Sequence, residues 1–132
     1  MNYMFSGCYN LSYLDLSNFD TSNIINMESM FSSCSSLSSL NLSNFDISKV
    51  TTMRFMFQNC FNINFLNLSN FDTSKVTFMG GMFCHCSNLK YIDLYNFNTS
   101  NVTNMAAIFQ NCSSLTYLDL SKFHTYLQHL KY

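Results

Sequence analysis

The chain has 132 residues, of which 48% are hydrophobic and 17% aromatic, so it can form one domain with a sizeable core. Only 10% of the residues are charged and the formal net charge is -1, and the sequence contains neither a basic stripe nor an acidic tail. We therefore expect no nucleic-acid partner and no capture by an anionic membrane, because both need clustered Lys or Arg.

Membrane-spanning and export segments have recognisable sequence patterns. No apolar run approaches the roughly 20 residues that span a bilayer, so we expect no membrane insertion. Met1 to Tyr3 leads directly into repeated sequence, and we expect no signal peptide in this chain. The residues themselves therefore leave the compartment undefined.

A 26-residue repeat organises the chain. A cysteine recurs at the same position of every copy, and the surrounding motif keeps register from Met4 to Phe123. The copies must stack, because one unit cannot bury its apolar side alone. We divide the single domain 1–132 into the tail of a preceding repeat at 1–3, full repeats at 4–29, 30–55, 56–81 and 82–107, and a degenerate C-terminal capping repeat at 108–132.

The first half of each repeat predicts a strand. In "LSYLDLSNF", Leu14 and Leu16 alternate with Tyr13, Asp15 and Ser17, which is the pattern of a half-buried strand. The leucines are predicted to point inward and the other side chains outward. Equivalent strands should pair in parallel, giving a five-stranded sheet.

The second half of each repeat predicts a short helical segment. In "DTSNIINMESMF", Ile24, Met27 and Phe31 recur at intervals of three and four residues, and Asp20 or Ser22 could cap the start. The expected fold is thus an α/β solenoid, with a parallel β-sheet on one face and short helical segments on the other.

Stacking of five copies also predicts columns of like residues in the core. The three main structural ladders are Leu16, Leu42, Leu68, Leu94 and Leu120; Phe19, Phe45, Phe71, Phe97 and Phe123; and Cys8, Cys34, Cys60, Cys86 and Cys112. We interpret the cysteines as small buried hydrophobic residues with free thiols, because parallel Cβ vectors disfavour disulfides between neighbouring rungs.

The repeated motif resembles a known family. Written as "LDLSNFDTSNVTNM..MF..C..L", and present with small changes from Leu94 to Leu115, it is similar to the BspA-like leucine-rich repeat, the bacterial surface protein 26-residue repeat. The resemblance implies a right-handed, leucine-rich-repeat-like coil of five repeats. It also implies a cell-surface or secreted protein that acts in adhesion or protein recognition without catalysis.

One cluster contains residue types that can bind a metal ion. Cys84, His85 and Cys86 are adjacent, and His124 and His129 lie one repeat further on. A zinc site would need a second such cluster, which the sequence lacks. We expect no metal and no other cofactor, and interpret Cys84 as an exposed cysteine.

Catalysis has no clear candidate residues. The repeated serines belong to turns, and within the body of the repeats only His85 could serve as a general base. We therefore expect that the protein is not an enzyme.

The outward strand positions form the candidate binding face. Exposed aromatic residues in polar surroundings are typical of recognition surfaces, but aromatic ladders also stabilise sheets without any partner, and both interpretations stay open. The candidate residues are Tyr13, Asp15, Phe65, Tyr91, Asp93, Tyr95, Tyr117 and Asp119.

Two functions follow. The first is a non-catalytic protein-interaction or adhesion module that presents this face to a protein or glycan partner. The alternative is a structural subunit of a larger surface layer, particle or filament. In that case a homo- or hetero-oligomer would form through the uncapped N-terminal coil, where Met4 and Phe5 would be exposed.

Overall fold

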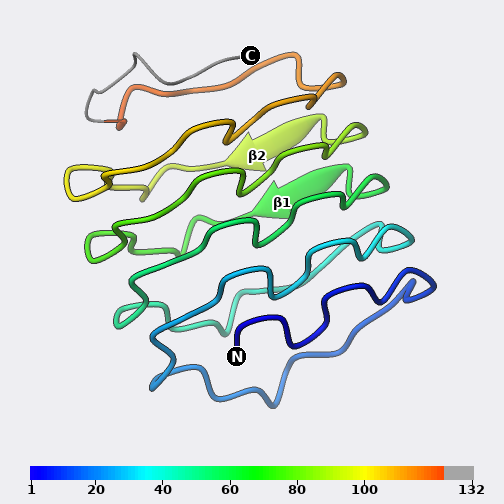
Figure 1. Ribbon diagram of the computed structural model, residues 1–132, viewed down its shortest axis with the longest axis horizontal. Coiled ribbons are helices and arrows are strands. Elements are labelled where there is room, and N and C mark those ends of the chain that lie inside the picture. The colour runs from blue at the N-terminus through cyan, green and yellow to red at the C-terminus, as the bar shows by residue number, and fades with distance from the viewer. Residues whose placement is uncertain (124–132) are drawn as a thin grey trace.

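The computed structural model describes residues 1–123, and in it the chain forms a stack of similar windings (Figure 1). We call residues 4–29, 30–55, 56–81, 82–107 and 108–123 windings one to five. Backbone hydrogen bonds join each winding to the next: Phe5 N–H donates to the Met30 carbonyl at 2.9 Å, and Phe31 N–H donates to that of Met56 at 2.9 Å. Residues about one repeat apart are therefore direct neighbours.

The predicted five-stranded sheet is wrong. The described residues contain two strands, β1 (Phe65–Asn67) and β2 (Tyr91–Asp93), which pair in parallel in one two-stranded sheet. Phe65 is opposite Tyr91, and Asn67 is opposite Asp93. Figure 1 shows the two strands lying side by side in windings three and four.

The strands are short because their own side chains end them. Asn67 Oδ1 accepts a hydrogen bond from the Ser69 N–H at 3.0 Å, and Asp93 Oδ1 accepts one from the Tyr95 N–H at 3.0 Å. Such Asx turns offer the backbone N–H a local partner in place of the neighbouring strand. Each strand therefore stops at the Asn or Asp.

The predicted α/β solenoid with helical segments is also wrong, because residues 1–123 contain no helix. In the segment expected to be helical, Met30 N–H donates to the Met27 carbonyl at 3.2 Å, which closes a tight turn. Alternate N–H groups donate instead to the next winding, as Met27 does to Thr52 at 3.1 Å. The N–H groups are thus shared between local turns and the next winding, and no run of i to i-4 bonds forms.

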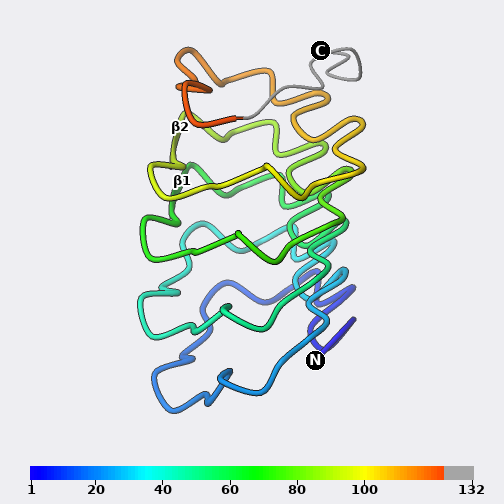
Figure 2. The ribbon, with the colours of Figure 1, turned by 90° about the vertical axis from the view of Figure 1, so that its left-hand side faces the viewer.

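Left-handed residues prevent the helix from propagating. Ser29 and Ser33 have φ angles of 55° and 62°, a conformation that interrupts a right-handed helix. A pair of left-handed residues four positions apart recurs every 26 residues, where one winding passes into the next. Figure 2 shows these turn-rich segments on the side of the stack opposite β1 and β2. The left-handed residues are Tyr3, Gly7, Ser29, Ser33, Phe55, Asn59, Gly81, His85, Ala107 and Asn111.

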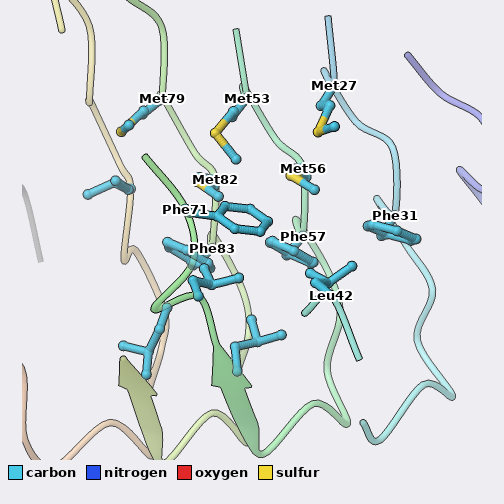
Figure 3. Packing of buried hydrophobic residues seen from close by; sticks show 14 of the residues in the cluster. Met27, Phe31, Leu42, Met53, Met56, Phe57, Phe71, Met79, Met82 and Phe83 are labelled. Atoms are coloured by element: carbon cyan, nitrogen blue, oxygen red, sulfur yellow. The ribbon is translucent and has the colours of Figure 1, made fainter. Parts of the chain in front are cut away.

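A column of phenylalanine rings runs through the core behind these turns. Neighbouring rings lie 5.3 to 5.7 Å apart between centroids and are nearly parallel, which is the offset arrangement that aromatic pairs favour. Figure 3 shows Phe31, Phe57 and Phe83 in this column, and Met27, Met53 and Met79 in a second column. The complete column consists of Phe5, Phe31, Phe57, Phe83 and Phe109.

The Leu and Phe ladders named from the sequence also lie in the core. Their central members are fully enclosed, as at Leu68 and Phe71, which both have 0% exposure. The remaining buried members are Leu16, Leu42, Leu94, Phe45, Phe97 and Phe123, whereas Phe19 and Leu120 are half-buried. The ladder is therefore most tightly packed where it has a winding on both sides.

Asparagine side chains join the windings at the corner after the strand position. Asn44 Nδ2 donates to the Leu16 carbonyl at 2.9 Å, and Asn70 Nδ2 donates to the Leu42 carbonyl at 3.1 Å. Asn96 donates to the Ser69 carbonyl in the winding before it. The Asn of the recurring "LSNF" therefore satisfies backbone carbonyls of the preceding winding, which explains its repetition.

Candidate recognition site

A side chain that makes the same contact in every winding has a structural role, whereas a side chain that departs from the repeat is a candidate for binding. Every winding carries Asp or Asn at the position equivalent to Asn67 in β1 and Asp93 in β2. In each case Oδ1 accepts a hydrogen bond from the N–H two residues later. Asp15 and Asp119 belong to this set. Their carboxylates thus have a structural role that the sequence interpretation as a binding face did not identify.

Windings four and five form a hollow of about 350 Å³ on the strand side. This volume falls within the range of small-molecule sites. Five of the predicted face residues come together there. The lining residues are Tyr91, Ile92, Asp93, Leu94, Tyr95, Tyr117, Asp119, Ser121 and Lys122.

Two side chains in this hollow depart from the repeat. Tyr95 occupies a position that is Ser in the other four copies, and Lys122 occupies one that is Asn in the other four. Lys122 Nζ lies 5.7 Å from the centroid of the Tyr95 ring, within the range of a cation–π contact. The two departures therefore meet in space.

The tyrosines of the hollow present their rings to solvent. Tyr95 is 71% exposed and Tyr117 is 65% exposed, whereas Tyr91 is 46% exposed because it stacks on Phe65. The Phe65 and Tyr91 rings lie 5.6 Å apart with an interplanar angle of 11°. Phe65 thus supports the hollow from the preceding winding, winding three, without lining it.

The hollow contains both signs of charge. The pKa of Asp119 is held below its usual range, first by the hydrogen bond from the Ser121 N–H, so this carboxylate is ionised at neutral pH. Asp93 contributes a second carboxylate and Lys122 an ammonium group. The arrangement can stack against a flat or apolar ring and exchange hydrogen bonds with polar groups around its rim.

The two remaining predicted residues lie elsewhere. Tyr13 and Asp15 line a second hollow of about 240 Å³ over windings one and two, together with Ser39, Asn41 and Asn44. The predicted face is therefore divided into two separate hollows. Sequence reasoning missed Lys122; the available signal was the Lys at a position otherwise occupied by Asn.

The cysteine positions point to packing and hydrogen bonding. Cys34, Cys60 and Cys86 are fully buried, Cys8 and Cys112 are half-buried, and all six thiols are free. The expectation that Cys84 is exposed is wrong, since its side chain is 5% exposed and its Sγ lies 3.8 Å from Gln110 Oε1. Burial raises the pKa of the Cys84 thiol.

Within residues 1–123, no group of His, Cys, Asp and Glu side chains is arranged to hold a metal ion. His85 Nδ1 lies 3.2 Å from Asn111 Nδ2, so the ring contacts the next winding. His124 and His129, which were considered as further ligands, lie outside the described residues. Residues 1–123 contain no helix and therefore no helical segment that could span a membrane.

The sequence matches one family twice, over residues 1–65 and 57–129, and that family is described as "Mycoplasma protein of unknown function, DUF285". The chain belongs to the DUF285 family. Two matches in succession agree with the internal repetition of this DUF285 protein. No curated protein and no solved structure matches the chain.

Proposed function

We propose that this DUF285 protein is a non-catalytic recognition module that holds a protein or glycan partner against the strand side of windings four and five. The observation that carries the proposal is the meeting of Tyr95 and Lys122. Both depart from the repeat, and neither residue type is needed at its position, because the other windings fold with Ser and Asn there. Exposed Tyr side chains add contact area at low entropic cost.

The repeat motif supports a narrower assignment to the BspA-like surface repeat proteins. With that assignment would come a cell-surface or secreted location and a role in adhesion. The exposed aromatic side chains agree with such a role, since exposed aromatic residues are enriched where proteins meet partners.

A binding assay with cultured animal cells tests the proposal. The fluorescently labelled natural chain should bind to the cells, and a Tyr91→Ser, Tyr95→Ser variant should bind at least tenfold more weakly. Tyr9→Ser is the matched control, because Tyr9 is 62% exposed and lies outside the hollow, and Ser occupies the same repeat position in three other copies.

Thermal unfolding of the same variants separates binding from sheet stability. An aromatic pair such as Phe65 and Tyr91 contributes roughly 0.2–1 kcal/mol to a sheet without any partner. Loss of stability with unchanged cell binding would assign these aromatics to the fold alone. Loss of binding with the fold intact would support recognition.

The alternative function, a subunit of a surface layer, particle or filament, requires self-association. Light scattering of the isolated chain over a range of concentrations distinguishes the two functions. Growth of the scattering mass with concentration would favour the structural subunit, whereas a constant monomeric mass would favour the recognition module.

A further inference from the structure

The lining of the hollow over windings four and five restricts the chemistry of its ligand. The Asx turns of Asp93 and Asp119 use Oδ1 as the acceptor, so the second carboxylate oxygen, Oδ2, takes no part in either turn. Tyr91, Tyr95 and Tyr117 add hydroxyl groups, each of which can donate and accept a hydrogen bond. The hollow therefore offers both acceptors and donors next to exposed ring faces.

The mixed charges of the hollow disfavour strongly ionic ligands. Asp93 and Asp119 oppose an anion, because burying like charges together is costly. Lys122 opposes a cation, because its ammonium group carries the same charge. The ligand that fits is neutral and rich in hydroxyl groups.

A hexopyranose has these properties. One face of the sugar ring carries C–H groups that pack against an aromatic ring, and the hydroxyl groups around its edge can donate to carboxylates and accept from Tyr hydroxyls or an ammonium group. A volume of about 350 Å³ accommodates one or two such rings. The hollow is open, so a sugar at the end of a longer chain could enter.

We propose that this hollow binds the neutral hexose end of a glycan, with Tyr95 and Tyr117 as stacking platforms and Asp93, Asp119 and Lys122 as hydrogen-bonding partners. The proposal rests on the proposed recognition function and names its ligand class. The remaining windings would serve as the scaffold that positions these five side chains.

Saturation-transfer NMR on the full chain tests this proposal directly. The probes are the methyl glycosides of glucose, galactose, mannose and N-acetylglucosamine, with N-acetylneuraminic acid as an anionic probe and choline as a cationic probe. At least one neutral glycoside should show saturation transfer and millimolar binding. Preference for the anionic or cationic probe, or transfer to none of the glycosides, would overturn the proposal.

A double variant that restores the repeat provides a sharp test. Tyr95→Ser with Lys122→Asn introduces the residues found in the other windings, so the fold should be retained, and Asn at 122 could donate to the preceding winding as Asn44 does. Glycoside binding should weaken at least tenfold in this variant and remain unchanged in Tyr9→Ser. Equal binding by the natural chain and the double variant would refute the site.

Treated cells distinguish failure of this proposal from failure of the recognition function. Periodate oxidises cell-surface glycans and protease removes cell-surface proteins together with their glycans, so binding that is lost after periodate supports a glycan ligand whether or not protease also abolishes it. Binding that survives periodate and is lost after protease would leave the recognition function standing and overturn the hexose proposal.

Discussion

The thiol of Cys60 donates a hydrogen bond to the backbone carbonyl of Phe31, one winding earlier, at a sulfur–oxygen distance of 3.1 Å. The same bond joins Cys34 to Phe5 at 3.1 Å and Cys86 to Phe57 at 3.1 Å. Cys112 repeats it with Phe83 at 3.0 Å. A cysteine therefore recurs every 26 residues because its side chain is small and apolar and still carries a weak donor.

Removing this donor should destabilise the stack. Cys60→Ala loses the hydrogen bond and leaves a small void, and we expect its free energy of unfolding to fall by about 1–2 kcal/mol. Cys8→Ala is the matched control, since Cys8 is half-buried and makes no thiol hydrogen bond within the described residues. Urea unfolding measures both, and equal losses would contradict a role for the bond.

Alkaline pH should also lower stability through these thiols. Burial raises the pKa of Cys34 from 9.0 to about 11 and that of Cys112 to about 11, and it raises the pKa of Cys60 and Cys86 further. The unfolded chain ionises first, so the stabilising contribution is complete below about pH 9 and is lost as pH rises towards the folded value.

Urea unfolding between about pH 8 and about pH 10 tests this dependence. The free energy of unfolding should decrease over this range, and the decrease should be smaller in a Cys60→Ala, Cys86→Ala variant. A variant with the same pH dependence as the natural chain would show that other groups cause it.

Acid should weaken the Asx turns. The pKa values of Asp15 and Asp46 are lowered first by backbone hydrogen bonds from Ser17 and Ser48, and that of Asp20 first by the Ser22 side chain. This stabilisation is present above the unfolded value of 3.8 and is lost as pH falls through the lower folded values.

Asparagine should replace these aspartates without that acid sensitivity. Asn41 and Asn67 already make the turn of Asp15 with an amide oxygen, and Asn98 makes the turn of Asp20 and Asp46, so an Asp15→Asn, Asp20→Asn, Asp46→Asn variant should keep the fold. Its melting temperature should change less between about pH 6 and about pH 3 than that of the natural chain. An equal change in both proteins would show that these turns are insensitive to protonation.

The glycine at position 81 makes room for a ring. A Cβ at Gly81 would lie 2.5 Å from Cδ1 and Cε1 of Phe55. The left-handed backbone itself tolerates a Cβ at this repeat position, because Ala107 adopts it with a φ of 58°. Gly81→Ala should therefore cost about 1–2 kcal/mol through this overlap more than through backbone strain. In a Phe55→Ala background the cost should be smaller by about 1 kcal/mol, as a double-mutant cycle measures.

Truncation of a central ladder residue should be severe. Leu68 has 0% exposure with windings on both sides, so Leu68→Ala should lower the free energy of unfolding by about 3 kcal/mol or more. Leu120→Ala should cost less, because Leu120 is only half-buried. Chemical denaturation compares the two, and a neutral Leu68→Ala would be incompatible with the observed core.

The repeat was predictable from the sequence, whereas the backbone conformation was not. The spacing of Met27 and Phe31 predicts that both face the core, and both are buried. That spacing fits a helix, but it also fits a chain that turns at Ser29 and Ser33 in the left-handed region. The spacing of apolar residues predicts which side chains point towards the core. It does not predict which carbonyl accepts the hydrogen bond from each backbone N–H.

The site was predictable in part, for a similar reason. Tyr91 and Tyr117 stand out as outward aromatic residues, and both line the hollow. Lys122 was missed because it lies beyond the strand pattern, and only its long side chain brings it over Tyr95. The turn-forming role of Asp15 was missed because the repeats carry either Asp or Asn at this position, which suggests a variable residue. Both residues nevertheless supply the same Oδ1 acceptor.

The spacing of the bonds between windings has a genetic consequence. Phe31 reaches Met56 and Phe57 reaches Met82 across the same interval of 25 residues. Recombination between two copies that removes or adds one whole unit would rejoin equivalent partners, whereas a one-codon deletion would misalign a winding with its neighbour. Such genes can therefore change in length by whole units while the encoded protein keeps its shape.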